Sequence, residues 1–190
     1  MLKTRLLLPL SFATLLLAGC TTTHYIQIEP TASIKKEQLQ NDRAIQVTTN
    51  TQLGNHIGAI KTGLNERADI FTTNDVKESV NKSIINGLTQ LGFTPDQGVY
   101  PPAELNVVIT KMSYTTKAKN LKTTATLDFQ LAATVKAKGQ TYKANFGSQK
   151  VEEYGTLPYQ STVQEDMNDL ASKTVSRLLS DQNIITLLKE

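Results

Sequence analysis

The stretch LKTTATLDFQLAATVKA, residues 121–137, alternates apolar and polar side chains over most of its length. Apart from Thr123, its odd positions are apolar, and its even positions, apart from Ala132, are polar or charged. Alternation with a period of two predicts a β-strand that is buried on one face. An unbroken strand of this length would span about 55 Å at about 3.3 Å per residue, so we expect it to bend or bulge partway.

This strand has predicted partners on both sides. Gly139-Gln140 fits a two-residue type II′ turn into a second strand. Pairing through that turn brings three apolar pairs onto one face: Ala137 with Tyr142, Val135 with Ala144, and Ala133 with Phe146. On the other side, Leu105–Thr116 is predicted to pair through a loop near residues 117–120, with a bulge between Ile109 and Met112 where the apolar phase shifts.

Two longer amphipathic helices are predicted around this meander. Asp75–Leu91 carries an apolar stripe and ends at Gly92, a residue suited to a left-handed helix stop. The second helix has a capping box at Ser161–Gln164 and a stripe formed by Val163, Met167, Leu170, Thr174 and Leu178. Asp181 caps a short final helix over residues 182–188. A strand is predicted at Arg43–Thr51, followed by loops and turns around a short segment in residues 54–66.

The order of these elements predicts the fold class. We expect a two-layer α+β sandwich in which a mostly antiparallel sheet, with its long β-meander, carries two amphipathic helices on one face. Residues 43–190 form a single domain in this interpretation. A chain of about 145 residues can bury roughly two-thirds of its unfolded surface, which is sufficient for one core without disulfides.

The first twenty residues predict export. Lys3 and Arg5 precede an apolar run over residues 6–17, followed by Leu17-Ala18-Gly19-Cys20. A charged start, a short apolar region and a small-residue exit are typical of a secretory signal, and the run is short for an uncleaved membrane anchor. The motif at Cys20 resembles the lipobox of bacterial lipoproteins. The alternative is a secreted protein with a stray cysteine.

The lipobox resemblance implies that residues 1–19 are removed and that Cys20 is acylated. Cys20 is therefore the predicted lipid attachment residue, and this covalent lipid is the only prosthetic group expected. Thr21 stands where lipoproteins kept at the inner membrane usually carry Asp, which implies an outer-membrane anchor with the domain facing the periplasm. Residues 20–42 are predicted to be the lipidated N-terminus and a flexible tether that holds the domain off the bilayer and can include a short strand at Tyr25–Glu29.

The whole chain resembles the YajG-type family of enterobacterial outer-membrane lipoproteins. The likeness rests on the lipobox, the polar segment after it, Leu91-Gly92-Phe93, Leu105-Asn106-Val107-Val108-Ile109 and the Thr- and Ala-rich hairpin before a C-terminal helix. It implies location and fold. No activity is assigned to that family, and Cys20 alone carries over as a functional residue.

Composition excludes several classes of function. Removal of residues 1–19 leaves 18 basic and 17 acidic residues, so the mature chain lacks the basic surplus of a nucleic-acid-binding protein. One cysteine and two histidines, His24 in the predicted tether and His56 in a glycine-rich loop, predict no disulfide and no metal site. No catalytic motif is present, and Glu152 and Glu153 are expected on opposite faces of a strand. The Glu165-Asp166 pair matches the dipole of the helix it opens. We therefore do not expect an enzyme.

Lysines gather in the hairpin region. Residues 111–150 contain eight lysines and one acidic residue, Asp128. The predicted register places Lys136 opposite Lys143, with Lys122 and Lys138 on the same polar face. Like charges opposed across strands are destabilising, so these four lysines form a candidate anion-binding face. The alternative is that they protect an exposed sheet from edge-to-edge aggregation.

The functional hypothesis that follows is a lipid-anchored binding or accessory module of the Gram-negative cell envelope. Its candidate partners are the membrane itself through the acyl chains, an envelope protein, peptidoglycan or anionic lipid. Nucleic acid is not expected. Two alternatives remain open: a structural lipoprotein that self-associates through an open sheet edge, and, less favoured, a cell-wall enzyme.

Overall fold

The alternating stretch lies at the centre of a large sheet. The computed structural model describes residues 21–35, 39, 43–95 and 97–189. Three long antiparallel strands form the predicted meander: β5 (Val99–Lys119), β6 (Lys122–Ala137) and β7 (Gln140–Tyr154). Burial alternates along much of β6, as the period of two requires. The strand is 16 residues long and spans about 50 Å.

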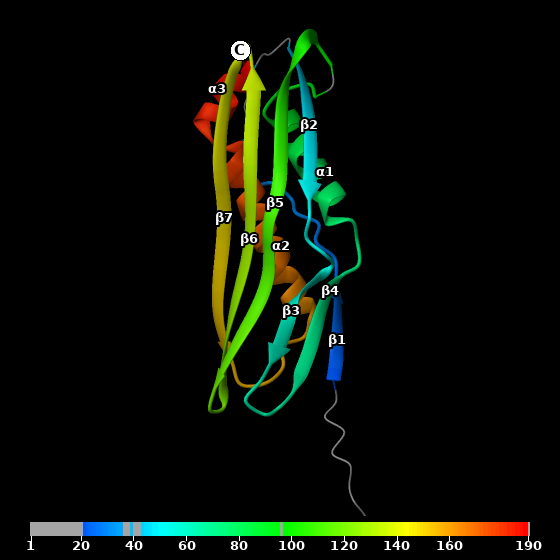
Figure 1. Cartoon of the computed structure of the whole chain (residues 1–190), viewed down its shortest axis with the longest axis vertical. Coiled ribbons are helices and arrows are strands. Elements are labelled where there is room, and N and C mark those ends of the chain that lie inside the picture. The colour runs from blue at the N-terminus through cyan, green and yellow to red at the C-terminus, as the bar shows by residue number, and fades with distance from the viewer. Residues whose placement is uncertain (1–20, 36–38, 40–42, 96, 190) are drawn as a thin grey trace, which may run out of the picture.

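Four shorter strands complete a seven-stranded mixed sheet (Figure 1). They are β1 (Thr21–Ile26), β2 (Arg43–Thr51), β3 (His56–Lys61) and β4 (Arg67–Thr72). The main path of the sheet runs β1-β4-β3-β5-β6-β7, and β2 pairs with β5 in parallel. Two strands therefore share one edge of β5: β2 reaches Ile109 through Thr51, and β3 meets Tyr114 through Gly58. The predicted bulge is confirmed, between Ile109 and Lys111.

Three helices pack on one face of this sheet, so the α+β fold class is confirmed. They are α1 (Val76–Gln90), α2 (Gln160–Leu179) and α3 (Gln182–Lys189). Their apolar stripes meet the inward residues of β5 and β6 in one continuous core. At the end of α1, Gly92 adopts a φ of 95° and the Phe93 N–H donates to the Leu88 carbonyl, which confirms the predicted left-handed stop. None of the described helices is both long and apolar enough to cross a bilayer.

The predicted capping box of the second helix is wrong. Helix α2 begins at Gln160, and its N-cap residue Tyr159 makes no side-chain capping bond. The Gln164 side chain is instead used elsewhere, because its Oε1 accepts the backbone N–H of Gln27 at 2.8 Å. Asp181 does cap α3 as predicted, by accepting the N–H groups of Asn183 and Ile184 at 3.0 Å.

The turn between β6 and β7 lies one residue earlier than predicted. Lys138 and Gly139 both have positive φ, 46° and 78°, so they form the turn and Ala137 pairs with Gln140. This shifts the pairing by two residues: Val135 lies opposite Tyr142, Ala133 opposite Ala144, and Leu131 opposite Phe146. A shift of two preserves the face on which each side chain lies, so the apolar face was predicted correctly.

The segment predicted to be a tether is part of the fold over residues 21–35. Strand β1 pairs with β4 in parallel, and the side chains of Ile26 and Ile28 are completely buried. Beyond β1 the chain continues in extended form alongside α2. The prediction of a free tether over residues 20–42 is therefore wrong for this part of the chain. Cys20, residues 1–19 and most of residues 36–42 lie outside the described residues.

A ladder of hydrogen bonds joins this segment to α2. Every second backbone N–H of the segment donates to a side chain four residues further along the helix: Tyr25 to Gln160, Gln27 to Gln164, Glu29 to Asn168, Thr31 to Ser172, and Ser33 to Ser176. Two extended residues advance about 6.6 Å and four helical residues about 6.0 Å, so the two spacings nearly match. Side chains of α2 therefore accept hydrogen bonds from backbone N–H groups of this edge segment, which no strand among the described residues pairs with.

The long strands give the molecule two distinct ends (Figure 1). The Thr21 end holds the first residue of β1, the β3–β4 turn (62–66), the β5–β6 turn (120–121) and the β7–α2 loop (155–159). The Lys138 end holds the β6–β7 turn, the start of β5 and helix α3. The described chain thus begins at one end, and the turn with two of the predicted lysines beside it lies at the other.

Candidate functional site

The four predicted lysines do not form one cluster. Lys122 begins β6 and Lys136 lies near its end, so about 45 Å separates them along the strand. Lys136 is paired with Thr141, and Lys143 is paired with Thr134. The predicted opposition of Lys136 and Lys143 is therefore wrong, because it depended on the misplaced turn.

Acidic side chains partner several of these lysines. Lys122 forms an ion pair with Glu153 at 3.5 Å, and Lys136 forms one with Glu104, also at 3.5 Å. These pairs are exposed and contribute little to stability. They do reduce the net positive charge of the outer sheet face. Of the four predicted lysines, Lys122 thus lies at the Thr21 end, and the other three lie toward the Lys138 end.

Asp128 takes part in a further ion pair on the outer face. Its carboxylate is nearly buried and accepts hydrogen bonds from Lys111 Nζ at 2.9 Å and from Gln149 Nε2 at 2.8 Å. Burial raises the pKa of Asp128, but these two hydrogen bonds outweigh burial and leave the pKa below its ordinary value. The single acidic residue of the lysine-rich stretch is therefore a structural partner of Lys111.

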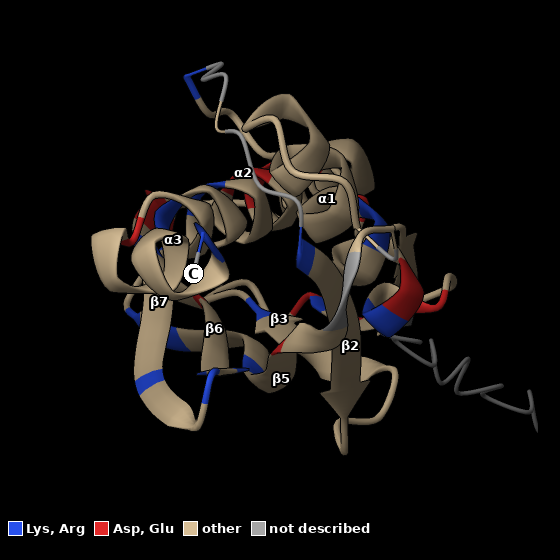
Figure 2. Ribbon diagram, turned by 90° about the horizontal axis from the view of Figure 1, so that it is seen from above, with Lys and Arg blue, Asp and Glu red and all other residues tan. Residues whose placement is uncertain are grey.

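A pocket at the Lys138 end brings two of the predicted lysines together with an arginine. Its volume is about 300 Å³, at the lower limit of the roughly 300–1,000 Å³ typical of ligand sites. Its lining residues come from the start of β2, the start of β5, the end of β6, the β6–β7 turn and the start of β7: Arg43, Pro101, Pro102, Glu104, Lys136, Ala137, Lys138, Gly139, Gln140 and Thr141. Figure 2 looks onto this end of the molecule.

The local backbone explains how this pocket is formed. The β6–β7 turn is tight because Lys138 and Gly139 adopt left-handed conformations, and it lies at the same end of the sheet as the start of β5. Pro101 and Pro102 form the facing wall, and the Pro101 carbonyl accepts a hydrogen bond from Arg43 Nη1 at 3.4 Å. Three basic residues and one carboxylate line the pocket, so it carries a positive surplus suited to a carboxylate or phosphate group. Sequence reasoning missed Arg43, because its contact with residues near 101 and 138 depends on the parallel pairing of β2 with β5.

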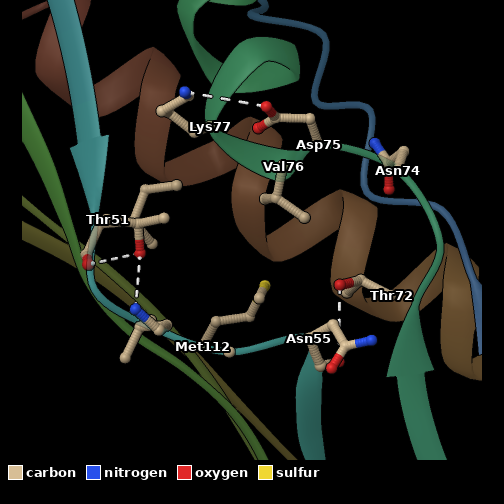
Figure 3. A pocket seen from close by; sticks show the side chains of 11 residues that line it. Thr51, Asn55, Thr72, Asn74, Asp75, Val76, Lys77 and Met112 are labelled. Carbon is tan, nitrogen blue, oxygen red and sulfur yellow. Dashed lines mark hydrogen bonds and ion pairs between the residues drawn. The ribbon is translucent and has the colours of Figure 1, made fainter.

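A second, smaller pocket lies where β2 and β3 part along the edge of β5 (Figure 3). Its volume is about 160 Å³, with the apolar side chains of Val76, Ile109 and Met112 among its lining residues. The Thr51 hydroxyl at its rim already has two partners: Oγ1 donates to the Ile109 carbonyl at 3.4 Å and accepts the Leu53 N–H at 3.1 Å. This pocket is below the usual size of a ligand site.

A charged triad lies between α2 and the edge strand β7. Lys150 Nζ is 2.6 Å from Asp166 Oδ1 and also contacts the Glu152 carboxylate. Burial raises the pKa of Asp166, whereas the hydrogen bond from Lys150 lowers the pKa of Glu152. The same two carboxylates raise the pKa of Lys150 through their hydrogen bonds. The sequence had indicated the helix dipole as the reason for Asp166. The structure adds an ion pair with Lys150 that positions this carboxylate. The triad fastens the N-terminal half of α2 to β7.

The two glutamates considered as a catalytic pair point in opposite directions. Glu152 faces the helix layer, and Glu153 lies on the outer face with Lys122. The predicted divergence of these carboxylates is confirmed.

Both histidines lie in strands of the sheet, His24 in β1 and His56 at the start of β3. His24 lies on the inward side of β1 and is 5% exposed, so its predicted place in a mobile tether is wrong. Burial lowers its pKa from the ordinary value of 6.5. His56 is half-exposed, with Nε2 3.6 Å from an Asp69 carboxylate oxygen. Among the described residues, no three His, Cys, Asp or Glu side chains converge as metal ligands would.

Comparisons with known proteins place the chain in context. A family model described as "Uncharacterized lipoprotein" matches residues 30–189. The crystal structure of a Xanthomonas campestris protein of family DUF330 has a TM-score of 0.55 at 8% identity and covers 89% of this chain and 96% of that chain. That likeness is one of fold. No curated protein matches the sequence significantly.

Two other solved structures show weaker similarity. A homologue of neuraminyllactose-binding hemagglutinin from Helicobacter pylori has a TM-score of 0.41 at 11% identity, covering 83% of this chain and 96% of that chain. A PelC dodecamer from Paraburkholderia phytofirmans has a TM-score of 0.39 at 12% identity, covering 80% of this chain and 95% of that chain.

Proposed function

The chain belongs to this family of uncharacterized lipoproteins, and on that premise we propose that it is anchored through Cys20 and binds an anionic component of the cell envelope at its Lys138 end. In this proposal it is an accessory or binding protein of the outer membrane, of the YajG type, with its domain in the periplasm. The ligand carries carboxylate groups, as acidic proteins and the peptides of peptidoglycan do. We propose no catalytic role.

The family and the N-terminal sequence support the anchor. Cys20 follows an apolar run and two small residues, and it is the single cysteine of the chain. Stable anchoring needs more than one acyl chain, since each buried CH₂ contributes about 0.8 kcal/mol and one chain gives marginal binding. The resemblance to lipoproteins supplies several chains on one residue. Thr21 at the next position supports sorting to the outer membrane.

The position of the basic pocket carries the binding proposal. Arg43, Lys136 and Lys138 line a pocket at the end of the sheet opposite Thr21, so the long strands separate it from the anchor. A pocket about 50 Å from the anchoring residue is poorly placed to bind headgroups of its own bilayer. It is well placed to meet a ligand deeper in the periplasm.

In-cell photocrosslinking tests this proposal. A photoreactive residue replaces Gln140, which lines the pocket, and a matched control replaces Asn145, which is exposed on β7. We expect position 140 to capture a specific acidic protein or a peptidoglycan fragment and position 145 to capture neither. Equal capture at both positions would contradict the proposal.

Charge variants then identify the contact. The double variant Lys136→Gln with Lys138→Gln removes two positive charges from the pocket, and we expect it to abolish capture at position 140. The control variant Lys82→Gln with Lys173→Gln removes two charges from exposed helix positions, and capture should persist. Capture that survives both double variants would show that the basic pocket is not the binding site.

Self-association is the second candidate function, and the edge strand β7 supports it. This strand is 15 residues long and ends the main path of the sheet. Open edges of this length invite pairing with another copy, although Lys143 lies on the strand and the Arg177 guanidinium donates to the Gly147 carbonyl. Sedimentation of the lipidated protein in detergent distinguishes the two functions: a stable oligomer that dissociates when Asn145 is replaced by Pro would favour self-association.

A further inference from the structure

We propose that the Thr21 end of the domain rests directly on the anchoring bilayer, with the apolar tips of three loops in the interfacial region. Leu64 lies in the β3–β4 turn and Leu121 in the β5–β6 turn, while Tyr159 ends the β7–α2 loop as the N-cap residue of α2. This inference rests on the lipid anchor of the proposed function. It is independent of what the Lys138-end pocket binds.

The connection between anchor and domain leaves no slack. Thr21 is already part of β1, where it pairs with Arg67. Cys20 immediately precedes Thr21, and neighbouring Cα atoms are about 3.8 Å apart across a trans peptide. Acyl chains on Cys20 therefore bring the end of the sheet to the membrane surface. A free tether over residues 20–42, as the sequence alone suggested, would have permitted any orientation.

The three loops support one another and form a common surface. Gly63 packs so closely on the β5–β6 turn that a Cβ at this position would lie 2.0 Å from the Asn120 carbonyl oxygen. The Leu157 N–H donates to Glu66 Oε2 at 3.2 Å, which joins the β7–α2 loop to the β3–β4 turn. A Cβ at Gly155 would lie 3.7 Å from the Leu121 carbonyl oxygen. The loop tips thus have fixed relative positions.

These tips are unusually apolar for exposed turns. Tyr159 is 82% exposed, Leu121 67% and Leu64 53%. Tyr159 and Leu121 are the two most exposed large apolar side chains among the described residues. A single exposed apolar residue needs no explanation, but two leucines and a tyrosine at the end that carries the anchor do. Leucine and tyrosine suit the boundary between headgroups and acyl chains, where an apolar body is buried and a hydroxyl stays hydrated.

Basic residues at the same end favour a lipid surface over a second protein. Lys119 and Lys122 face each other across the β5–β6 hairpin, directly beside Leu121, and Lys122 also forms the exposed ion pair with Glu153. Glu153 offsets one of these two positive charges, and anionic headgroups would offset the other and relieve the remaining repulsion. The combination of apolar tips and flanking lysines is typical of segments that lie in a membrane interface.

Depth-dependent quenching tests this inference on the lipidated mature protein in phosphatidylethanolamine–phosphatidylglycerol vesicles. Leu121→Cys and Tyr159→Cys introduce single labelling sites, because Cys20 is occupied by the lipid. An environment-sensitive fluorophore on each cysteine is then exposed to nitroxide lipids with shallow labels. The control is Val108→Cys, an exposed apolar position on β5 in the half of the molecule nearer the Lys138 end.

We expect strong quenching and a blue-shifted emission at positions 121 and 159, and background quenching at position 108. If the protein floats with the vesicles but all three positions show only background quenching, the inference is overturned and the anchor is left intact. Loss of the protein from floated vesicles would overturn the anchor and the inference together. Equal quenching at all three positions would indicate a domain lying flat on the bilayer and would also overturn it.

Discussion

Replacement of Ile28 by Ala tests whether the N-terminal segment is a structural part of the domain. The Ile28 side chain is completely buried, and its N–H donates to Asn74 Oδ1 at 3.0 Å. The substitution removes three carbons, which costs about 2.4 kcal/mol at about 0.8 kcal/mol for each buried CH₂. The cavity left behind adds to this cost, so we expect the free energy of unfolding to fall by about 2–5 kcal/mol.

The assay is urea unfolding of the chain from residue 21 onward, followed by far-ultraviolet circular dichroism. Glu29→Ala is the matched control, because the Glu29 side chain is exposed while its backbone N–H keeps the hydrogen bond to Asn168. We expect this variant to stay within about 0.5 kcal/mol of the parent. A similarly small effect of Ile28→Ala would refute the docking of the segment, since it is the result expected for a tether.

Three further predictions concern other parts of the fold. Burial keeps the pKa of His24 below its ordinary value, so the folded state binds fewer protons than the unfolded state. The free energy of unfolding should therefore decrease as pH falls below about 6.5. Urea titrations at several pH values should show a smaller decrease for His24→Leu. Gly63→Ala forces a Cβ against the Asn120 carbonyl and should lower the free energy of unfolding by about 1–3 kcal/mol. The control Gly54→Ala, whose Cβ would have nothing within 4 Å, should leave it unchanged. Equal melting temperatures for the two variants would contradict the contact between the turns. Lys111→Met removes the ion-pair partner of the nearly buried Asp128, so the pKa of that carboxyl should rise in an NMR titration. The free energy of unfolding should fall by about 1–3 kcal/mol. An unchanged pKa would contradict the assigned pairing.

Local periodicity was sufficient to predict the meander and the helices. The alternation in residues 121–137 identified β6 and the face it buries, because a period of two depends on neighbouring residues alone. The exact turn was not predictable in the same way. Both Gly139-Gln140 and Lys138-Gly139 place glycine in a two-residue turn, and the choice depends on the left-handed conformation of Lys138. The misplaced turn put Lys143 opposite Lys136, and the observed turn, one residue earlier, separates them and removes the argument for one lysine cluster.

The N-terminal segment that packs on α2 has an alternating pattern in its sequence, which its polar composition obscured. Its even positions, from His24 to Ile34, are mostly apolar and mostly buried, while the odd positions are polar. The polar stripe of α2, from Gln160 to Ser176 at every fourth residue, is the matching signal on the helix. Neither pattern identifies its partner alone, because the pairing joins residues more than 130 positions apart. The basic pocket likewise depends on long-range pairing of β2 with β5.

Neutron reflectometry on the lipidated protein at a supported bilayer tests the central claim most directly. The claim is that the domain stands upright on the anchor because Thr21 belongs to the sheet, with the Lys138 end pointing away from the membrane. An upright domain predicts a dense protein layer about 50–70 Å thick, the span of β6 and β5, that begins at the headgroups without an intervening water layer. A layer of about 25 Å, the thickness of a sheet with its helices, or a hydrated gap beneath the protein, would contradict the account.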